Sequence, residues 1–204
     1  MHARSTTFLS SPERLDAGMT LLRDEVMPAL LAMDGCLGLS AMVDRESGRC
    51  IATSAWETED AMRASADAVA PLRQRGAEIL GTDMTVANWE IALLHRMHNS
   101  GDGACVRCTW AHAEADRIDA AIERVRGSMS DLDRTAGFCG ASLLVSRDAG
   151  MTVLSTSWAD RSAIEGSRPA AAARQQNATA AGLDILEVAE FELLMAHLRV
   201  PEMA

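Results

Sequence analysis

Hydrophobic and polar residues alternate with two different periods along this chain. Residues 5–9 and 105–111 are short segments rich in β-branched or aromatic residues, which predicts strands. After each of them the hydrophobic residues recur every three or four positions, which predicts a helix with one buried face. These hydrophobic residues are Leu15, Met19, Leu22 and Val26 in the first half and Ile118, Ile122, Val125, Met129 and Leu132 in the second.

Signals for the start and end of a helix bound the first of these segments. The sequence Ser-Pro-Glu at residues 11–13 combines an N-cap residue, a proline at the first helical position and an acid in the first turn. Pro28 predicts a kink or a restart of the helix. Gly35 and Gly137 predict where the two helices end.

A β-hairpin is expected after each helix. The sequence VDRESGRCIATSAW, residues 43–56, returns as VSRDAGMTVLSTSW, residues 145–158. Gly48 and Gly150 end the two turns, where a residue with positive φ is often needed.

A second helix and a last strand complete each half. Thr58 and Asp160 are good N-caps for helices over residues 59–76 and 161–177. The final strands are predicted at 85–95 and 187–197, where every second residue is hydrophobic and these residues share one face. These residues are Trp89, Ile91 and Leu93 in the first half and Phe191, Leu193 and Met195 in the second.

The two halves are one sequence repeated at an offset of 102 residues. The register holds without a gap from Gly35 to Met97, and about a quarter of the paired positions are identical. We therefore predict an internal duplication. The domains are expected at residues 1–97 and 105–204, with a polar, glycine-rich linker at 98–104.

The order of elements is βαββαβ, found twice, which predicts an α+β protein made of tandem ferredoxin-like repeats. The outer faces of the strands are too hydrophobic for water, so the antiparallel sheets of the two copies are expected to pack on each other. The residues Gly-x-x-Gly, Val-x-Arg-x-x-Gly and Trp, at 35–56 and 137–158, resemble the hairpin of the dimeric α+β barrel superfamily. More narrowly, they resemble antibiotic biosynthesis monooxygenase (ABM) domains.

This resemblance implies an intramolecular pseudo-dimeric α+β barrel. It also implies cofactor-independent oxygenation of aromatic polyketides, or haem degradation, as activities of the family. The haem-degrading members carry an asparagine on the first strand and a tryptophan and a histidine on the second helix. Here the first strands, 5–9 and 105–111, contain no asparagine, and the second helices, 59–76 and 161–177, contain no tryptophan and no histidine. We therefore expect no haem and no other cofactor.

The charge of the chain and its lack of targeting signals limit which partners and which location are expected. The net charge is −10 and the pI about 4.9, which argues against nucleic acid and anionic membranes. No secretory signal and no transmembrane run is found, so a cytoplasmic location is expected. The sequence does not decide whether the chain forms a homo-oligomer.

A Cys-x-x-Cys motif is formed by Cys105 and Cys108. On a strand these two residues point to opposite faces, which disfavours a redox role.

Histidines are the candidate catalytic bases, because their pKa lies near neutral pH. His95 and His197 end the two last strands. His112 is aligned with Ser10, and this asymmetry suggests a single working site. For each histidine, a position without a special role is the competing interpretation.

Tryptophans and glutamates are the candidate substrate-binding residues. Trp56, Trp158 and Trp110 could form the walls of a pocket, or fill the hydrophobic core. Glu90 and Glu192 could bind a ligand, or form a structural network with arginines.

Two functions are consistent with the sequence. One is a cofactor-independent monooxygenase that acts on a small aromatic or hydrophobic molecule, with a histidine as base and an apolar pocket. The alternative is a non-catalytic protein that binds a small ligand or has a structural role. A pocket that contains a titratable group would favour the enzyme.

Overall fold

The computed structural model describes residues 1–98 and 100–198 of the chain. The chain divides into two compact units. The first contains Met1–Trp89 and the described chain from Leu193, and the second contains Glu90–Glu192. Strands β4 (Thr85–Arg96) and β8 (Asp184–Leu198) each run from one unit into the other.

Each unit has the predicted order of elements. The first contains β1 (His2–Leu9), α1 (Pro12–Leu21), the π-helical turn η1 (Leu22–Val26), α2 (Met27–Leu31), β2 (Cys36–Asp44), β3 (Arg49–Trp56), α3 (Glu59–Ala64) and α4 (Ala66–Leu80), followed by β4. The second contains β5 (Cys105–His112), the 3-10 turn η2 (Ala115–Arg117), α5 (Ile118–Gly127), α6 (Met129–Asp133), β6 (Phe138–Ser146), β7 (Met151–Trp158), α7 (Arg161–Gly166) and α8 (Arg168–Ala180), followed by β8.

The sheet topology confirms the predicted fold class. In the first unit β3 pairs antiparallel with both β1 and β2, and in the second β7 pairs in the same way with β5 and β6. Strand β8 adds to β5, and β4 adds to β6. The full hydrogen-bonded order, β1-β3-β2-β8-β5-β7-β6-β4, is that of a closed barrel. The chain is thus a tandem ferredoxin-like, pseudo-dimeric α+β barrel.

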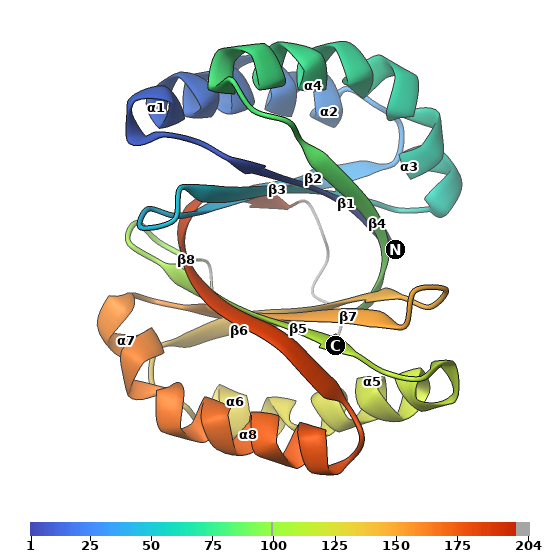
Figure 1. Ribbon diagram of the computed structural model, residues 1–204, viewed down its shortest axis with the longest axis vertical. Coiled ribbons are helices and arrows are strands. Elements are labelled where there is room, and N and C mark those ends of the chain that lie inside the picture. Colours follow the sequence, from blue (N-terminus) through green and yellow to red (C-terminus); the bar gives the residue numbers. More distant parts are fainter. Residues whose placement is uncertain (99, 199–204) are drawn as a thin grey trace. The chain divides into compact units, whose positions relative to one another are not determined.

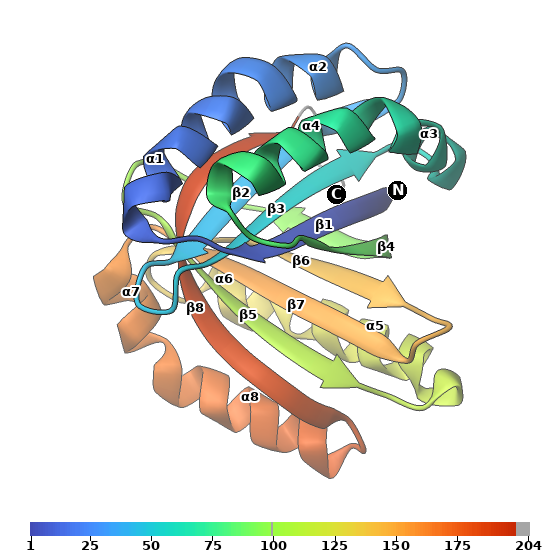
Figure 2. The same ribbon diagram turned by 45° about the horizontal axis from the view of Figure 1, so that its top comes forward.

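Within each unit the helices cover one face of the strands. Helices α1, α2 and α4 of the first unit lie over β1, β2 and β3, as Figures 1 and 2 show. Trp56, Met62 and Leu30 are buried between these layers. In the second unit, Trp158 and Ile164 occupy the corresponding core. Burial of such large side chains contributes about 1.5–3 kcal/mol each.

Several local predictions are confirmed. Gly48 and Gly150 have φ angles of 73° and 64°, as the hairpin turns require. Thr58 and Asp160 cap the helices that follow. Their side chains accept hydrogen bonds from the backbone N–H groups of Ala61 and Ala163 at 3.1 and 2.8 Å. The helix near Pro28 is interrupted by η1 and restarts as α2 at Met27.

The repeat register shifts by one residue before the hairpins. Ser10 donates its backbone N–H to Gly48, and Ala113 donates in the same way to Gly150. The first copy thus has one more residue than the second between these positions and the glycines at 35 and 137. Its first helix contains the π turn η1, whose i→i+5 bonds take up one residue more than an α turn.

This shift corrects one sequence alignment. Leu9 pairs with Arg49, and His112 pairs with Met151, which lies 102 residues further along. The equivalent of His112 is therefore Leu9, and Ser10 corresponds to Ala113. On the strands β1 and β5, equivalent residues differ by 103 in number.

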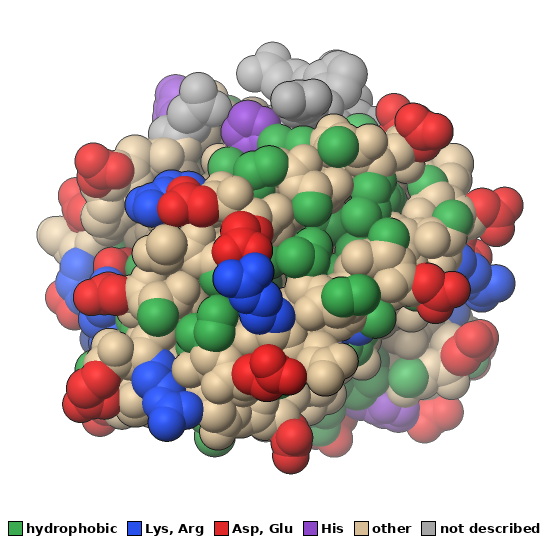
Figure 3. All heavy atoms as spheres, turned by 90° about the horizontal axis from the view of Figure 1, so that it is seen from above, with side chains coloured by type: hydrophobic (Ala, Val, Ile, Leu, Met, Phe, Trp, Pro, Cys, Tyr) green, Lys and Arg blue, Asp and Glu red, His purple; other side chains and the backbone are tan. Residues whose placement is uncertain are grey.

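The surface carries charges of both signs. On the face drawn in Figure 3, acidic and basic side chains are spread among hydrophobic ones. In the part of the chain that the structure describes, no helix combines the length and hydrophobicity of a membrane-spanning segment.

Candidate functional site

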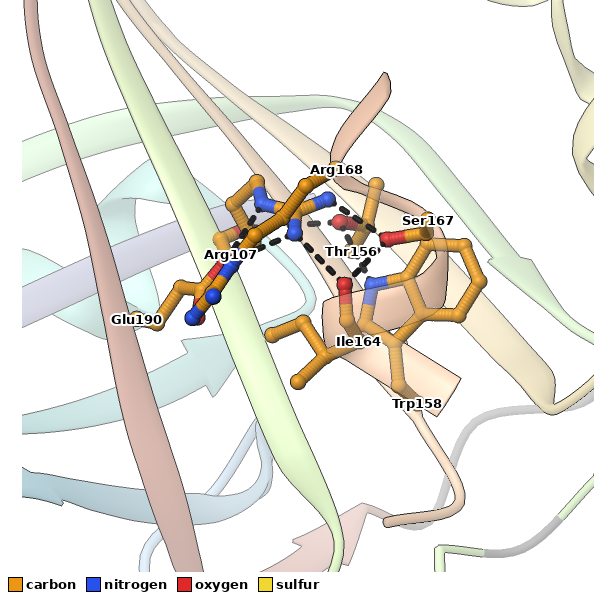
Figure 4. Close-up of polar contacts among 7 residues, drawn as sticks. All are labelled: Arg107, Thr156, Trp158, Ile164, Ser167, Arg168 and Glu190. Atoms are coloured by element: carbon orange, nitrogen blue, oxygen red, sulfur yellow. Dashed lines mark hydrogen bonds and ion pairs between the residues drawn. The ribbon is translucent and has the colours of Figure 1, made fainter. Parts of the chain in front are cut away.

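A buried arginine organises the second unit. Arg107 lies on β5 and is only 4% exposed. Its Nη1 donates to Ser167 Oγ and its Nη2 to the carbonyl oxygen of Ile164, both at 2.7 Å. Glu190 on β8 accepts from Nε at 3.1 Å and from Nη2 at 2.7 Å. Figure 4 shows how these groups from β5, β8 and the junction of α7 and α8 converge.

Glu190 is shared between two cations. Its second oxygen accepts a hydrogen bond from Arg168 at 2.7 Å. Burial favours the neutral acid, but the hydrogen bonds from Arg168 and Arg107 outweigh it and lower the pKa of Glu190. The buried charge of Arg107 is therefore compensated by a carboxylate that stays ionised at neutral pH.

A pocket of about 390 Å³ lies between the sheet and the helices of the second unit. Strands β5, β6 and β7 form its floor, and α5 and α8 form its walls. Its hydrophobic lining includes Leu143, Leu154, Leu183 and Ile185, and its charged lining consists of Arg107, Arg124, Arg174 and Asp131.

Arg174 gives the pocket its electrostatic character. Burial lowers the pKa of its guanidinium, and the positive charge of Arg107 lowers it further, while Asp131 acts in the opposite direction. Asp131 itself forms an ion pair with Arg134. Even with Arg107 offset by Glu190, the lining retains a positive charge, because Arg124 and Arg174 outnumber Asp131.

The first unit has the same arginine with a different partner. Arg4 on β1 is 7% exposed and donates to Ser65 Oγ at 3.1 Å and to the carbonyl oxygen of Met62 at 2.9 Å. Its Nε donates to Asn88 Oδ1 at 3.0 Å, where the second unit has Glu190. A smaller cavity of about 80 Å³, lined mainly by hydrophobic residues, adjoins it.

The sequence interpretation missed these two arginines. An alignment with one gap would pair Arg4 with Arg107, in ARSTTF and VRCTWA. The ungapped offset of 102 hides this pair. Ser65 and Ser167, which the offset does align, are the residues that bind the arginines.

The predicted tryptophans have different environments. Trp56 and Trp158 are completely buried, and their indole N–H groups donate to Ser54 and Thr156 at 3.0 and 3.1 Å. Trp56 borders the cavity of the first unit, whereas Trp158 does not line the larger pocket. Trp110 is partly buried and its ring meets that of Phe191 edge to face at 6.3 Å.

The predicted histidines lie away from the larger pocket. His95 Nε2 is 2.6 Å from Asp133 Oδ1, and its ring stacks on Phe138. His112 is partly buried with its ring against the turn at Gly150. His197 is exposed near the end of β8. Among the described residues that line the 390 Å³ pocket there is no histidine.

The predicted glutamates belong to other contacts. Glu90 forms an ion pair with Arg147 at 2.8 Å, and Arg147 also binds Asp119 at 2.9 Å. Glu192 lies opposite Cys105 in the β5–β8 register. Neither glutamate borders the larger pocket, so a binding role for them stays a prediction.

The cysteines have the character of core residues. Burial raises the pKa of Cys50 to about 11, and it raises the pKa values of Cys105 and Cys139 as well. Cys108 lies 3.3 Å from the hydroxyl of Ser155. Within residues 1–98 and 100–198, no group of three or more acidic, histidine or cysteine side chains could hold a metal ion.

Comparison with curated proteins finds close relatives. The uncharacterized proteins Rv2557 and Rv2558 of Mycobacterium tuberculosis H37Rv are each 48% identical to this chain. The alignments cover the whole of this chain and 92% and 87% of the two relatives. No family model matches the sequence.

Solved structures share the fold at low identity. A "putative monooxygenase" of Fusobacterium nucleatum has a TM-score of 0.71 at 13% identity, over 94% of this chain and 90% of the other. An anthrone oxidase-like protein has a TM-score of 0.66 at 13% identity, over 100% and 95%. A ferredoxin-fold protein of Listeria monocytogenes, related to antibiotic biosynthesis monooxygenases, has a TM-score of 0.54 at 8% identity, over 96% and 97%. These likenesses confirm the ABM-like fold.

Proposed function

For a chain that belongs to the family of the mycobacterial proteins Rv2557 and Rv2558, we propose that the second unit binds a small organic anion with a hydrophobic body. The observation that carries the proposal is the 390 Å³ pocket, in which a hydrophobic floor meets a positively charged wall. Its volume lies within the range of about 300–1,000 Å³ that is typical of small-molecule sites.

The hydrophobic and the charged residues of the lining would bind different parts of the ligand. Leu143, Leu154 and Ile185 would contact the hydrophobic body of the ligand, which would be removed from water. Arg174 and Arg124 would meet the anionic group. A half-buried guanidinium gains most from a carboxylate or an oxyanion, because it can donate two parallel hydrogen bonds.

The binding proposal can be tested with 2-naphthoate as the probe and the neutral 2-naphthamide as its matched control. Calorimetric titration of the whole protein is expected to show one site that prefers the anion. Arg174→Gln is expected to weaken 2-naphthoate binding at least tenfold, because a hydrogen bond to a charged group contributes about 1.5–3 kcal/mol.

A surface arginine of the same unit provides the matched control variant. Arg126 lies on α5, pairs with Glu123 and does not line the pocket. Arg126→Gln should bind 2-naphthoate like the original chain. Equal losses in both variants, or equal affinity for the acid and the amide, would contradict the proposal.

Cofactor-independent monooxygenation is the second candidate function, and two observations support it. Solved structures of the same fold include a "putative monooxygenase" and an anthrone oxidase-like protein. The positive pocket would also favour the deprotonated form of a substrate, which is the form that reacts directly with oxygen. Among the described residues that line this pocket, Asp131 is the one carboxylate, and we take it as the candidate base there.

Anthrone is a suitable probe for this activity. Removal of a proton from its CH₂ group gives an enolate, and reaction with O₂ gives anthraquinone and water. One oxygen atom enters the product and the other leaves as water, so the four electrons lost by the carbon reduce one O₂. Oxygen uptake and anthraquinone absorbance should rise together and fall at least tenfold in Arg174→Gln.

Variants of the candidate bases separate the two functions. Loss of turnover in Asp131→Asn would assign the base to the pocket. Loss in His95→Asn, His112→Asn or His197→Asn would assign it to one of the predicted histidines. Binding of 2-naphthoate without any oxygen uptake from anthrone would favour the non-catalytic binding protein.

A further inference from the structure

The first unit contains a buried positive charge that no carboxylate of the described chain compensates. Arg4 donates to Asn88, Ser65 and the backbone of Met62, and all three acceptors are neutral. Burial lowers the pKa of the Arg4 guanidinium, and the positive charge of Arg73 lowers it further. A buried guanidinium without a counter-charge is costly, which makes this position attractive to an anion.

The second unit shows what completes such a site. There the residue equivalent to Asn88 is Glu190, whose carboxylate binds Arg107 at 2.7 Å. The serine hydroxyl and the helix carbonyl that bind the arginine are the same in both units. The two arginine sites therefore differ in the partner of the guanidinium Nε, which is a carboxylate, also bound by Arg168, in the second unit and a neutral amide in the first.

We propose that the cavity of the first unit binds a small aliphatic carboxylate, whose anionic group pairs with Arg4 and Arg73. Both arginines line the cavity. A guanidinium has five N–H donors, and the three hydrogen bonds of Arg4 leave two for the ligand. This site is separate from the larger pocket of the second unit, and it does not depend on the function proposed there.

The rest of the cavity favours an aliphatic chain. Phe8, Leu21, Leu30, Leu72 and Met84 line it, so most of its wall is hydrophobic. Its volume of about 80 Å³ suits a short chain rather than a fused aromatic ring system. Affinity should therefore rise roughly fourfold with each added methylene until the chain fills the cavity.

The π turn contributes to this cavity. Leu22 and Val26, the first and last residues of η1, both line it. The π turn that takes up the extra residue of the first copy thus contributes two side chains to the wall of the cavity. The second unit, which lacks this residue, has a larger and more polar pocket in the equivalent place.

The proposal can be tested by calorimetric titration of the whole protein with acetate, butyrate and hexanoate, with hexanol as the uncharged control. Asn88→Glu would introduce the carboxylate that the second unit has, next to Arg4. It is expected to weaken hexanoate binding at least tenfold. Asn88→Gln keeps an amide at this position and should change the affinity less than twofold.

Two further variants keep the test decisive. Arg73→Gln removes the second cation without touching the core, and it should weaken hexanoate binding severalfold even if Asn88→Glu does not fold. Arg126→Gln should leave hexanoate binding unchanged, because Arg126 pairs with Glu123 on the surface and lines neither cavity. No hexanoate binding by the original chain, equal binding by Asn88→Glu, or loss of binding in Arg126→Gln would each overturn the proposal.

Discussion

The two units place the same arginine on the same strand but compensate its charge differently. In the second unit Glu190 accepts hydrogen bonds from both Arg107 and Arg168, whereas in the first unit Asn88 offers Arg4 a neutral amide oxygen. The helix contacts of the two arginines are otherwise alike. The two units thus share the arginine, the serine and the helix carbonyl of the site, and they differ in whether the arginine has a carboxylate partner.

The largest expected effect on stability comes from replacing the side chains that bind the two arginines, Glu190 and Asn88. Glu190→Gln should lower the free energy of unfolding of the second unit by about 3–5 kcal/mol, because it leaves Arg107 buried without a counter-charge. Asn88→Ala in the first unit should cost about 1 kcal/mol, since only one hydrogen bond to a neutral group is lost. Urea unfolding of both variants measures the difference, and equal costs would contradict the comparison.

Removal of the arginines should give a smaller contrast of the same kind. Arg107→Met leaves Glu190 with Arg168 alone and is expected to cost about 2–3 kcal/mol. Arg4→Met removes a buried charge that has no carboxylate partner, so it should be within about 1 kcal/mol of neutral. Thermal unfolding in the absence of added carboxylates tests this, and a more damaging Arg4→Met would be inconsistent with an uncompensated charge.

The pH dependence of stability should depend on the second unit. The pKa of Glu190 lies below its ordinary value of 4.5, so folding favours the ionised form. This stabilisation is present above about pH 4.5, and it is lost as the pH falls through the lower pKa of the folded state. As the pH falls below about 4.5, the free energy of unfolding of Glu190→Gln should therefore change less than that of the original chain. An unchanged slope would count against the proposed pairing.

The smallest effect should be the same in both units. Thr58→Ala and Asp160→Ala each remove an N-cap hydrogen bond from a matching helix. Each should cost about 1 kcal/mol. Unfolding of the two variants side by side is the measurement, and a cost in one unit alone would show that the frames of the two units are less alike than their geometry indicates.

The helices, strands and turns of each unit were predictable from the sequence because they depend on local signals. Gly48 and Gly150, together with Thr58 and Asp160, mark turns and caps through their own backbone and side-chain chemistry. The hydrophobic periods identify the helices and strands that follow. The resemblance to ABM domains then supplies the closure of the sheet, which no local pattern contains.

The candidate sites were not predictable in the same way, because they depend on a register. One additional residue, accommodated in a helix with a π turn, shifts the offset from 103 to 102. This shift hid the equivalence of Arg4 and Arg107 and led to the comparison of His112 with Ser10. The pairing of Arg107 with Glu190 spans 83 residues, so neither charge indicates its partner locally.

The most direct test of the different charge compensation is the NMR signal of the arginine side chains during a titration with hexanoate. The Nε–H resonances of Arg4 and Arg107 can be assigned with the variants Arg4→Met and Arg107→Met. We predict that the Arg4 signal shifts and saturates, whereas the Arg107 signal, held by Glu190, does not move. A fixed Arg4 signal, or equal shifts of both signals, would contradict the account.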